Sequence, residues 1–111
     1  MRALQFTSYG NPEVLTWADA PDPHAGAGQV RIAVRAASVN PIDWKALSGA
    51  MSGGEPLAAT AYLGYDAAGV VDEVGEGVGD VAVGDDVLGR GRNTQAEYDV
   101  VLAHLRIPET V

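Results

Sequence analysis

Two glycine-rich runs are the first candidates for chemistry, because loops of this kind can hold phosphate groups. Residues 75–80 read Gly-Glu-Gly-Val-Gly-Asp and nearly match the dinucleotide-binding pattern, but the third glycine comes one position early. Residues 89–94 read Gly-Arg-Gly-Arg-Asn-Thr. Neither run opens a helix, whose N-terminus would bind the anion, and the acids of the first run repel pyrophosphate. Both runs are therefore predicted to be turns.

Metal and nucleophile chemistry have little support in the sequence. The chain has no cysteine and two histidines, His24 and His104, which lie far apart without a partner four residues away. The acids between Asp80 and Asp86 lack the calcium-binding pattern of alternating ligands that ends in a glutamate. The Gly-x-Ser-x-Gly motif of a hydrolase is absent. We expect both histidines in surface loops or at strand ends, and we expect no bound metal.

The charges argue against a nucleic-acid partner. The chain has 15 acids and 7 bases, which gives a formal net charge of −8. Between Lys45 and Arg90 there is no base, and the acids there are Glu55, Asp66, Asp72, Glu73, Glu76, Asp80, Asp85 and Asp86. Such a surface repels the phosphate backbone that nucleic-acid-binding proteins neutralise with lysine and arginine. This acidic stretch is predicted to be a solvated face.

The 111 residues suit one domain that buries roughly 60–65% of its unfolded surface. A content of 47% hydrophobic and 20% charged residues is typical of a globular protein. The sequence has no apolar run near the ~20 residues of a membrane span and no signal peptide at its start. The expectation is therefore a cytoplasmic protein without a membrane partner.

The elements that must position any site are short strands and one helix. Asn40 suits an N-cap, Pro41 the first helical position, Asp43 the first turn and Gly49 the residue after the last turn. Residues 30–35 alternate apolar and polar side chains, the pattern of a strand with one buried face. Further strands are expected at 2–7, 14–17, 67–74, 87–89 and 96–102, with loops at 20–28 and 50–61 and a last run from Arg106. The predicted fold class is mainly β, a compact barrel with one or two short helices.

Several motifs carry a family resemblance. They are Val-Asn-Pro-Ile-Asp-Trp-Lys at 39–45, Leu-Gly-Tyr-Asp-Ala-Ala-Gly-Val-Val-Asp-Glu-Val-Gly-Glu-Gly-Val at 63–78 and Val-Gly-Asp-Asp-Val-Leu-Gly at 83–89. Residues 1–3, 10–15, 28–30 and the Gln-Ala-Glu-Tyr of 95–98 agree as well. With these motifs the sequence resembles the N-terminal catalytic domain of the medium-chain dehydrogenase/reductase superfamily, over essentially all 111 residues. The resemblance implies a GroES-like, partly open β-barrel.

Within that superfamily the sequence is similar to the zinc-free quinone oxidoreductase and enone reductase branch. Zinc alcohol dehydrogenases have a cysteine at the position of Asn40 and a His-Glu pair at the positions of Tyr65 and Asp66. Asparagine and tyrosine cannot replace thiolate and imidazole as ligands of a catalytic zinc. The resemblance therefore implies no zinc cofactor.

The resemblance also implies roles for five residues. Asn40 and Tyr65 are the catalytic candidates; Asn40, Pro41 and Trp44 are the candidates for contact with the nicotinamide; Trp44, Met51 and Tyr65 are the candidates for contact with substrate. Each has a structural alternative, since Asn40 suits a helix cap, and Trp44 and Tyr65 suit the core. Three neighbours are expected to be structural: Asp43 stabilises its own helix, Lys45 is a solvated cation, and Asp66 hydrogen-bonds an arginine across the cleft.

The function that the resemblance implies is the substrate-side part of an NADPH-dependent oxidoreductase. Hydride passes from the nicotinamide to a quinone or to the β-carbon of an α,β-unsaturated carbonyl compound, and the intact enzyme is a homodimer. Without a metal, the negative charge on the carbonyl oxygen needs hydrogen-bond donors or water in a dry cleft.

Members of this superfamily bind NADP(H) through a second, Rossmann-type half, which residues 1–111 do not contain. The chain is therefore expected to be a domain, a fragment or a truncated product, and to be inactive by itself. Two alternatives to an enzyme stay open, a non-catalytic GroES-like module that acts by protein contact and an inactive fragment.

Overall fold

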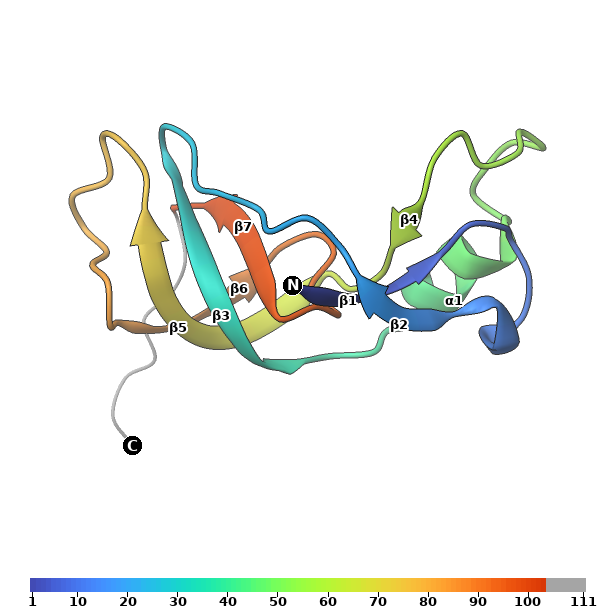
Figure 1. Ribbon diagram of the computed structural model, residues 1–111, viewed down its shortest axis with the longest axis horizontal. Helices are drawn as coiled ribbons and strands as arrows, with labels where there is room; N and C mark the ends of the chain where they lie inside the picture. Colours follow the sequence, from blue (N-terminus) through green and yellow to red (C-terminus); the bar gives the residue numbers. More distant parts are fainter. Residues whose placement is uncertain (104–111) are drawn as a thin grey trace.

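The computed structural model describes residues 1–103, which form two antiparallel sheets and a short α-helix (Figure 1). The smaller sheet has the order β2-β1-β4 and the larger sheet the order β6-β5-β3-β7. The strands are β1 (Arg2–Phe6), β2 (Thr16–Asp19), β3 (Gln29–Ala37), β4 (Ala61–Tyr62), β5 (Asp66–Val74), β6 (Asp86–Arg90) and β7 (Tyr98–Leu102). The helix is α1 (Pro41–Ser48), and a 3-10 turn, η1 (Pro12–Val14), connects β1 to β2.

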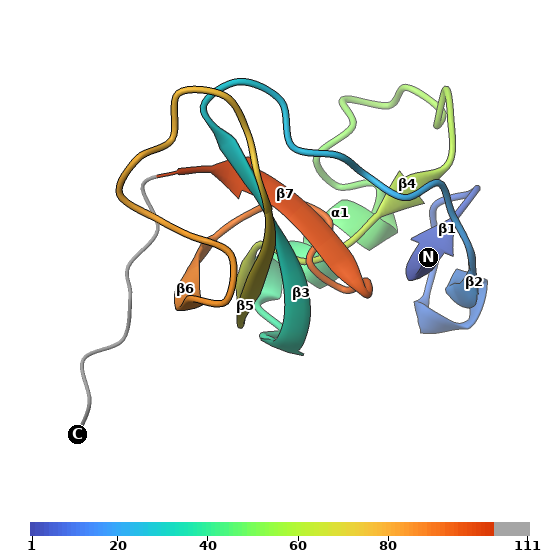
Figure 2. The ribbon, with the colours of Figure 1, turned by 60° about the vertical axis from the view of Figure 1, so that its left-hand side comes forward.

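The predicted fold class is confirmed, since strands make up 39% of residues 1–103 and helix, with η1 included, 11%. In Figure 2 the four strands of the larger sheet curl around one another, and the smaller sheet lies to one side. This arrangement is the partly open β-barrel that the sequence predicts. Within residues 1–103, no helix is long and apolar enough to cross a membrane.

The alternating pattern of β3 builds the core of the larger sheet. Val30 and Ile32 are fully buried, and they pack with Val71 and Val101 from the two flanking strands, β5 and β7, and with Val87 from β6. Burying a side chain of this size contributes about 1.5–3 kcal/mol relative to leaving it in water. The alternation of apolar and polar residues in β3 therefore predicts correctly which face of the strand is buried.

A second core forms where α1 packs on the smaller sheet. Leu47 of the helix is buried against Phe6 of β1 and Leu63, which follows β4. Gly49 ends the helix in the left-handed conformation, with φ of +85°, as expected from its position after the last turn. The helix is held against the sheet by this apolar contact and by a hydrogen bond from Gly10 N to the Leu47 carbonyl oxygen, at 3.0 Å.

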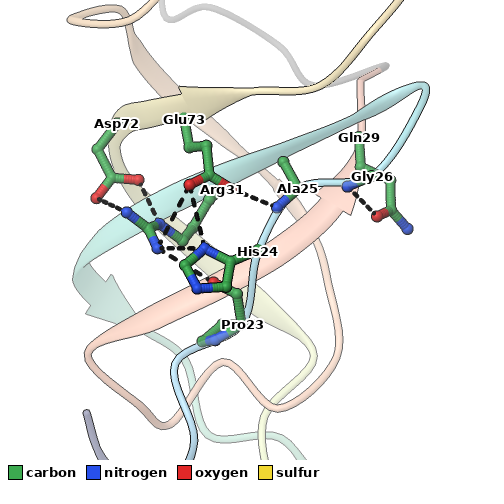
Figure 3. Close-up of polar contacts among 8 residues, drawn as sticks. All are labelled: Pro23, His24, Ala25, Gly26, Gln29, Arg31, Asp72 and Glu73. Carbon is green, nitrogen blue, oxygen red and sulfur yellow. Dashed lines mark hydrogen bonds and ion pairs between the residues drawn. The ribbon is translucent and has the colours of Figure 1, made fainter.

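On the outer face of β3, Arg31 fastens the proline-rich loop that precedes the strand (Figure 3). Its guanidinium donates to both carboxylate oxygens of Asp72, at 2.8 and 3.3 Å, and to the carbonyl oxygen of Pro23, at 3.1 Å. His24 Nδ1 lies 3.2 Å from Glu73 Oε2. His24 is exposed in this loop, as predicted. The contacts of Arg31 with Asp72 and of His24 with Glu73 place these two β5 carboxylates beside the loop.

The 91–97 segment, between β6 and β7, joins the two sheets. Gln95 N donates to the Leu63 carbonyl oxygen at 3.0 Å, and the Gln95 carbonyl oxygen accepts from Leu4 N at 2.8 Å. Ala96 forms an isolated bridge with Ala3. The sequence predicts a strand from residue 96, but β7 begins at Tyr98 because residues 95–97 pair with the smaller sheet instead.

Other differences from the sequence expectations are small. The second predicted strand starts at Val14, but Val14 ends η1 and β2 starts at Thr16. β4 begins at Ala61, the last residue of the predicted loop. The first glycine-rich run, residues 75–80, is a turn, as predicted. The prediction is wrong for the start of the second run, because Gly89 and Arg90 pair with β5 and end β6, and only residues 91–94 are irregular. His104 and the run from Arg106 lie outside the described residues.

Gly64 provides the first test of this arrangement. Its φ is +104°, and a Cβ there would lie 2.2 Å from Thr94 Oγ1 and 2.7 Å from Gln95 N. We expect Gly64→Ala to lower the free energy of unfolding by about 3 kcal/mol or more, because a steric clash adds to the backbone strain. Urea denaturation measures this change.

Gly84→Ala is the matched control. Gly84 also has a positive φ, of +97°, but a Cβ there meets nothing within 4 Å. We expect a loss of about 1 kcal/mol from the backbone conformation alone. Equal losses in the two variants would contradict the close contact between Gly64 and the 91–97 segment.

Candidate functional site

The start of α1 is organised by a buried carboxylate. Asn40 occupies the N-cap position and Pro41 the first helical position, as predicted. Asn40 and Asp43 form a capping box, in which Asn40 N donates to Asp43 Oδ2 at 2.7 Å. Asp43 is 4% exposed, so this bond lies in a water-poor environment. The carboxylate of the third helical residue, Asp43, therefore holds the N-cap residue in place.

Asp43 also binds the chain segment in front of β5. Gly64 N donates to Asp43 Oδ1 at 3.1 Å, in the interior of the protein. Asp43 thus stabilises its own helix, as the sequence analysis expects, and in addition attaches the helix to Gly64. This second bond brings the start of α1 next to Tyr65 and Asp66, two of the residues singled out from the sequence.

The side chain of Asn40 faces Asp66 and Ser38. Asn40 Nδ2 donates to Ser38 Oγ at 3.0 Å and to Asp66 Oδ2 at 3.1 Å. A carboxylate only accepts hydrogen bonds, so the carboxamide nitrogen must be the atom that faces Asp66. Both hydrogens of the amide are used in these two bonds. The Asn40 carboxamide therefore has no N–H left for a developing oxyanion.

Asp66 is a shared acceptor for two donors. Its Oδ2 accepts from Ser38 Oγ at 3.1 Å as well as from Asn40. The sequence analysis expects a hydrogen bond between Asp66 and an arginine, and Arg90 lies opposite Asp66 in the β5–β6 pair. Within residues 1–103, however, Asp66 has no ion pair with an arginine, because its carboxylate is turned toward the loop that leads into α1.

Sequence reasoning overlooked Ser38 and Gln95 as parts of this site. Gln95 Nε2 donates to the Ser38 carbonyl oxygen at 3.0 Å, so the 91–97 segment supports the loop that holds Asn40. Gln95 opens one of the motifs that carry the family resemblance, and Ser38 lies two residues before Asn40. Their roles depend on contacts between residues far apart in sequence, which no local pattern reports.

Tyr65 lies between Gly64 and β5 and is half-buried. Its carbonyl oxygen accepts from Gly91 N at 2.8 Å, which fixes the backbone of Tyr65 against the end of β6. The structure therefore brings Asn40, Tyr65 and Asp66 into one region, built from α1, the start of β5 and the 91–97 segment.

Apolar side chains are exposed along α1 and in the residues on either side of it. Trp44 is 60% exposed and Met51, in the turn after the helix, 59%, and Val39 and Ile42 at the helix start are 81% and 37% exposed. The alternative that Trp44 belongs to the core is therefore wrong. Several exposed apolar groups on one element are typical of a surface that meets a ligand or another chain segment. Lys45 is exposed on the same helix, as predicted.

This group of residues does not fit a catalytic zinc. The residue at the cysteine position of the zinc enzymes, Asn40, hydrogen-bonds through its amide to Asp66, so neither side chain is arranged as a ligand. Within residues 1–103 there is no group of three histidine, aspartate or glutamate side chains that could hold a metal ion.

An open pocket of about 420 Å³ lies elsewhere, where β6 and β7 end. Its lining comes from Gln29, residues 90–92 and residues 100–102. None of the five site candidates contributes to it. The pocket shares Gly91 and Arg92 with the 91–97 segment, and Gly91 N is bonded to the Tyr65 carbonyl oxygen, so it adjoins the backbone of the candidate region without containing its side chains.

Comparison with known proteins supports the same family. Residues 26–104 match the model of the alcohol dehydrogenase GroES-like domain. A trans-enoyl reductase of Gibberella fujikuroi is 40% identical over 98 residues, which cover 82% of this chain and 28% of that protein. The quinone oxidoreductase of Rattus norvegicus is 39% identical over 89 residues, which cover 79% of this chain and 26% of that protein.

A solved mycobacterial structure in complex with NADPH is 31% identical, with a TM-score of 0.87 over 100% of this chain and 35% of that chain. The chain thus spans about a quarter to a third of the length of these relatives. The fold, the motifs and the matched residues agree. The chain belongs to the alcohol dehydrogenase GroES-like domain family, in the quinone oxidoreductase branch of the medium-chain dehydrogenase/reductase superfamily.

Proposed function

We propose that this chain forms the substrate side of an NADPH-dependent oxidoreductase that reduces quinones or α,β-unsaturated carbonyl compounds. The names of its relatives, a quinone oxidoreductase and a trans-enoyl reductase, support this substrate class. One structural observation carries the proposal: buried Asp43 holds the start of α1, with its exposed Trp44, beside Tyr65.

The residues around α1 suit the nicotinamide end of the cofactor. Trp44 presents a flat apolar ring that is 60% exposed, and Pro41 is exposed beside it on the helix. Flat rings of this kind pack favourably on one another. When bound, NADPH supplies the hydride. Neither glycine-rich run, residues 75–80 or residues 89–94, is followed by a helix, so the pyrophosphate has no ready anion site in them.

Tyr65 is the proposed hydrogen-bond donor to the substrate carbonyl oxygen. Its phenol O–H is a hydrogen-bond donor, and the residue is half-buried and directly follows Gly64, whose N–H binds Asp43 of α1. A donor in such a position stabilises the negative charge that develops on the oxygen. Asn40 has a different part in this proposal: its amide is used in bonds to Ser38 and Asp66, so it positions the helix start. Met51 lies in the turn after α1 and completes the apolar wall toward the substrate.

Binding of NADPH tests the proposed function. We expect NADPH to perturb the amide signals of Asn40, of residues 42–44 and of Tyr65 in an NMR titration of the labelled chain. Trp44→Ala should weaken binding by about 3- to 10-fold, the worth of one aromatic contact. Trp17→Ala is the control, because Trp17 is 49% exposed but lies on β2 in the smaller sheet. Equal binding by all three proteins would refute the proposed cofactor contact and favour a module that acts by protein contact.

A charge swap tests the positioning role of Asn40. Aspartate caps a helix as well as asparagine does. Asn40→Asp nevertheless places a second carboxylate at the position 3.1 Å from Asp66 Oδ2. We expect the free energy of unfolding at pH 7 to fall by about 1–3 kcal/mol. Adding Asp66→Asn should restore most of this loss, because a donor and an acceptor then face each other again.

Chemical denaturation of wild type, both single variants and the double variant measures this interaction as a double-mutant cycle. If Asn40→Asp is as stable as the wild type, the bond to Asp66 does not hold the Asn40 side chain. In that case the amide is free to face a ligand, and the catalytic interpretation of Asn40 returns.

Elemental analysis tests the expected absence of a zinc site. After chelation, incubation with zinc and dialysis, we expect the chain to retain much less than one zinc per molecule. The reason is that the side chains of Asn40 and Asp66 are hydrogen-bonded to each other and that the sequence contains no cysteine. One tightly held zinc that is lost in Asp66→Asn would contradict this expectation.

A further inference from the structure

A second carboxylate, Asp99 of β7, is buried beneath the 91–97 segment. It is 5% exposed, and its Oδ2 has no hydrogen-bond partner among residues 1–103. A Cβ on Gly91 would lie 2.3 Å from this oxygen, so the backbone of the segment packs directly on the carboxyl group. On the other side, Asp99 pairs in register with Ile32, a fully buried residue of β3. The carboxyl group is therefore enclosed by backbone and apolar side chains.

No charged side chain compensates Asp99 within residues 1–103. Only the backbone N–H groups of Val100 and Arg92 favour its ionised form. The ionisable residues on the elements around it are Arg31 and Arg35 of β3, Asp66, Asp72 and Glu73 of β5, Asp86 and Arg90 of β6, Arg92 and Glu97 of the 91–97 segment, Tyr98 of β7, and Tyr65. Within residues 1–103, none of their side chains forms a hydrogen bond or ion pair with the Asp99 carboxylate, and Arg31 is turned to Asp72 on the outer face. Burial raises the pKa of Asp99 from 3.8 to about 7.

The segment above Asp99 has a weak point at Thr94. Thr94 is fully buried, and its Oγ1 also lacks a hydrogen-bond partner in the described part of the chain. Its backbone N–H reaches the Gly64 carbonyl oxygen at 3.4 Å, the longest of the contacts between this segment and residues 63–65. The preceding residue, Asn93, has a positive φ of +62°. Two buried oxygens without partners thus lie next to the most weakly attached part of the segment.

We propose that Asp99 is a proton-binding site that controls how the 91–97 segment packs on residues 63–65. When Asp99 carries a proton, the neutral carboxyl group stays enclosed and the segment stays closed. When Asp99 loses the proton, the buried charge requires water, and the segment loosens at Thr94 to admit it. The device acts in the range of neutral pH and does not depend on the proposed oxidoreductase function.

The same segment connects this proton to the candidate site. Gln95 follows Thr94, and its side chain donates a hydrogen bond to the Ser38 carbonyl oxygen. The Ser38 hydroxyl in turn donates to Asp66 and accepts from Asn40. A segment that loosens at Thr94 also relaxes the bond from Gln95 to Ser38. Ionisation of Asp99 is therefore transmitted to the loop before α1.

The direction of the pH effect follows from the raised pKa. The folded protein binds the Asp99 proton more tightly than the unfolded chain does, so Asp99 costs no stability at low pH. Its destabilising effect grows as the pH rises from about 4 to 7 and is constant above that range.

Thermal unfolding between pH 4.5 and 8.5 tests the proposal with two variants. Asp99→Asn keeps the shape of the neutral carboxyl group and cannot ionise. Asp86→Asn removes the same charge from an exposed position of β6 and serves as the control. We expect the Tm of Asp99→Asn to exceed that of wild type by an amount that increases up to about pH 7, whereas Asp86→Asn follows the wild-type pH dependence. Parallel curves for wild type and Asp99→Asn would overturn the proposal.

A measurement on the wild type keeps the test decisive if Asp99→Asn does not fold. In a carboxyl-carbon NMR titration we expect the Asp99 signal to move with a midpoint near 7, together with the amide signals of Thr94, Gln95 and Ser38. A midpoint below 5 would overturn the buried proton. An Asp99 midpoint near 7 without movement of Thr94 and Gln95 would overturn its control of the segment.

Discussion

The candidate site depends on one buried carboxylate, that of Asp43. An ionised group that is 4% exposed is costly unless its oxygens accept hydrogen bonds. Asp43 accepts one from Asn40 N, which starts the helix, and one from Gly64 N, which precedes β5. Both donors are backbone groups, so their positions are set by the path of the chain. The need to satisfy this carboxylate therefore determines where α1 lies relative to the larger sheet.

Gly64 extends this constraint to the rest of the molecule. Its backbone is close to both Thr94 and Gln95, at a distance that excludes any side chain. The 91–97 segment is thereby pressed against the start of β5, and it carries Gln95 to the loop before α1. The helix, the two sheets and the segment between them are thus connected through contacts at two residues, Asp43 and Gly64.

The sequence predicts those parts of the fold that local rules decide. The alternation in β3 identifies its buried face, and Asn40, Pro41 and Gly49 mark both ends of α1. The motifs also place Asn40, Tyr65 and Asp66 near one another. Their detailed roles could not be predicted, because the partner of the Asn40 amide is a strand residue 26 positions away. Likewise the exposure of Trp44 depends on where the helix packs, which tertiary contacts decide.

The pairing of the 91–97 segment with β1 has a consequence for the order in which the chain folds during synthesis. Arg2 and Leu4 are made first, but their backbone partners, Glu97 and Gln95, are made more than ninety residues later. More than ninety further residues must therefore leave the ribosome before β1 gains its third neighbour. Contacts between such distant residues slow folding and leave a strand edge open in the meantime. The emerging chain thus exposes this edge of β1 while all the intervening strands are made, which gives chaperones a long opportunity to act there.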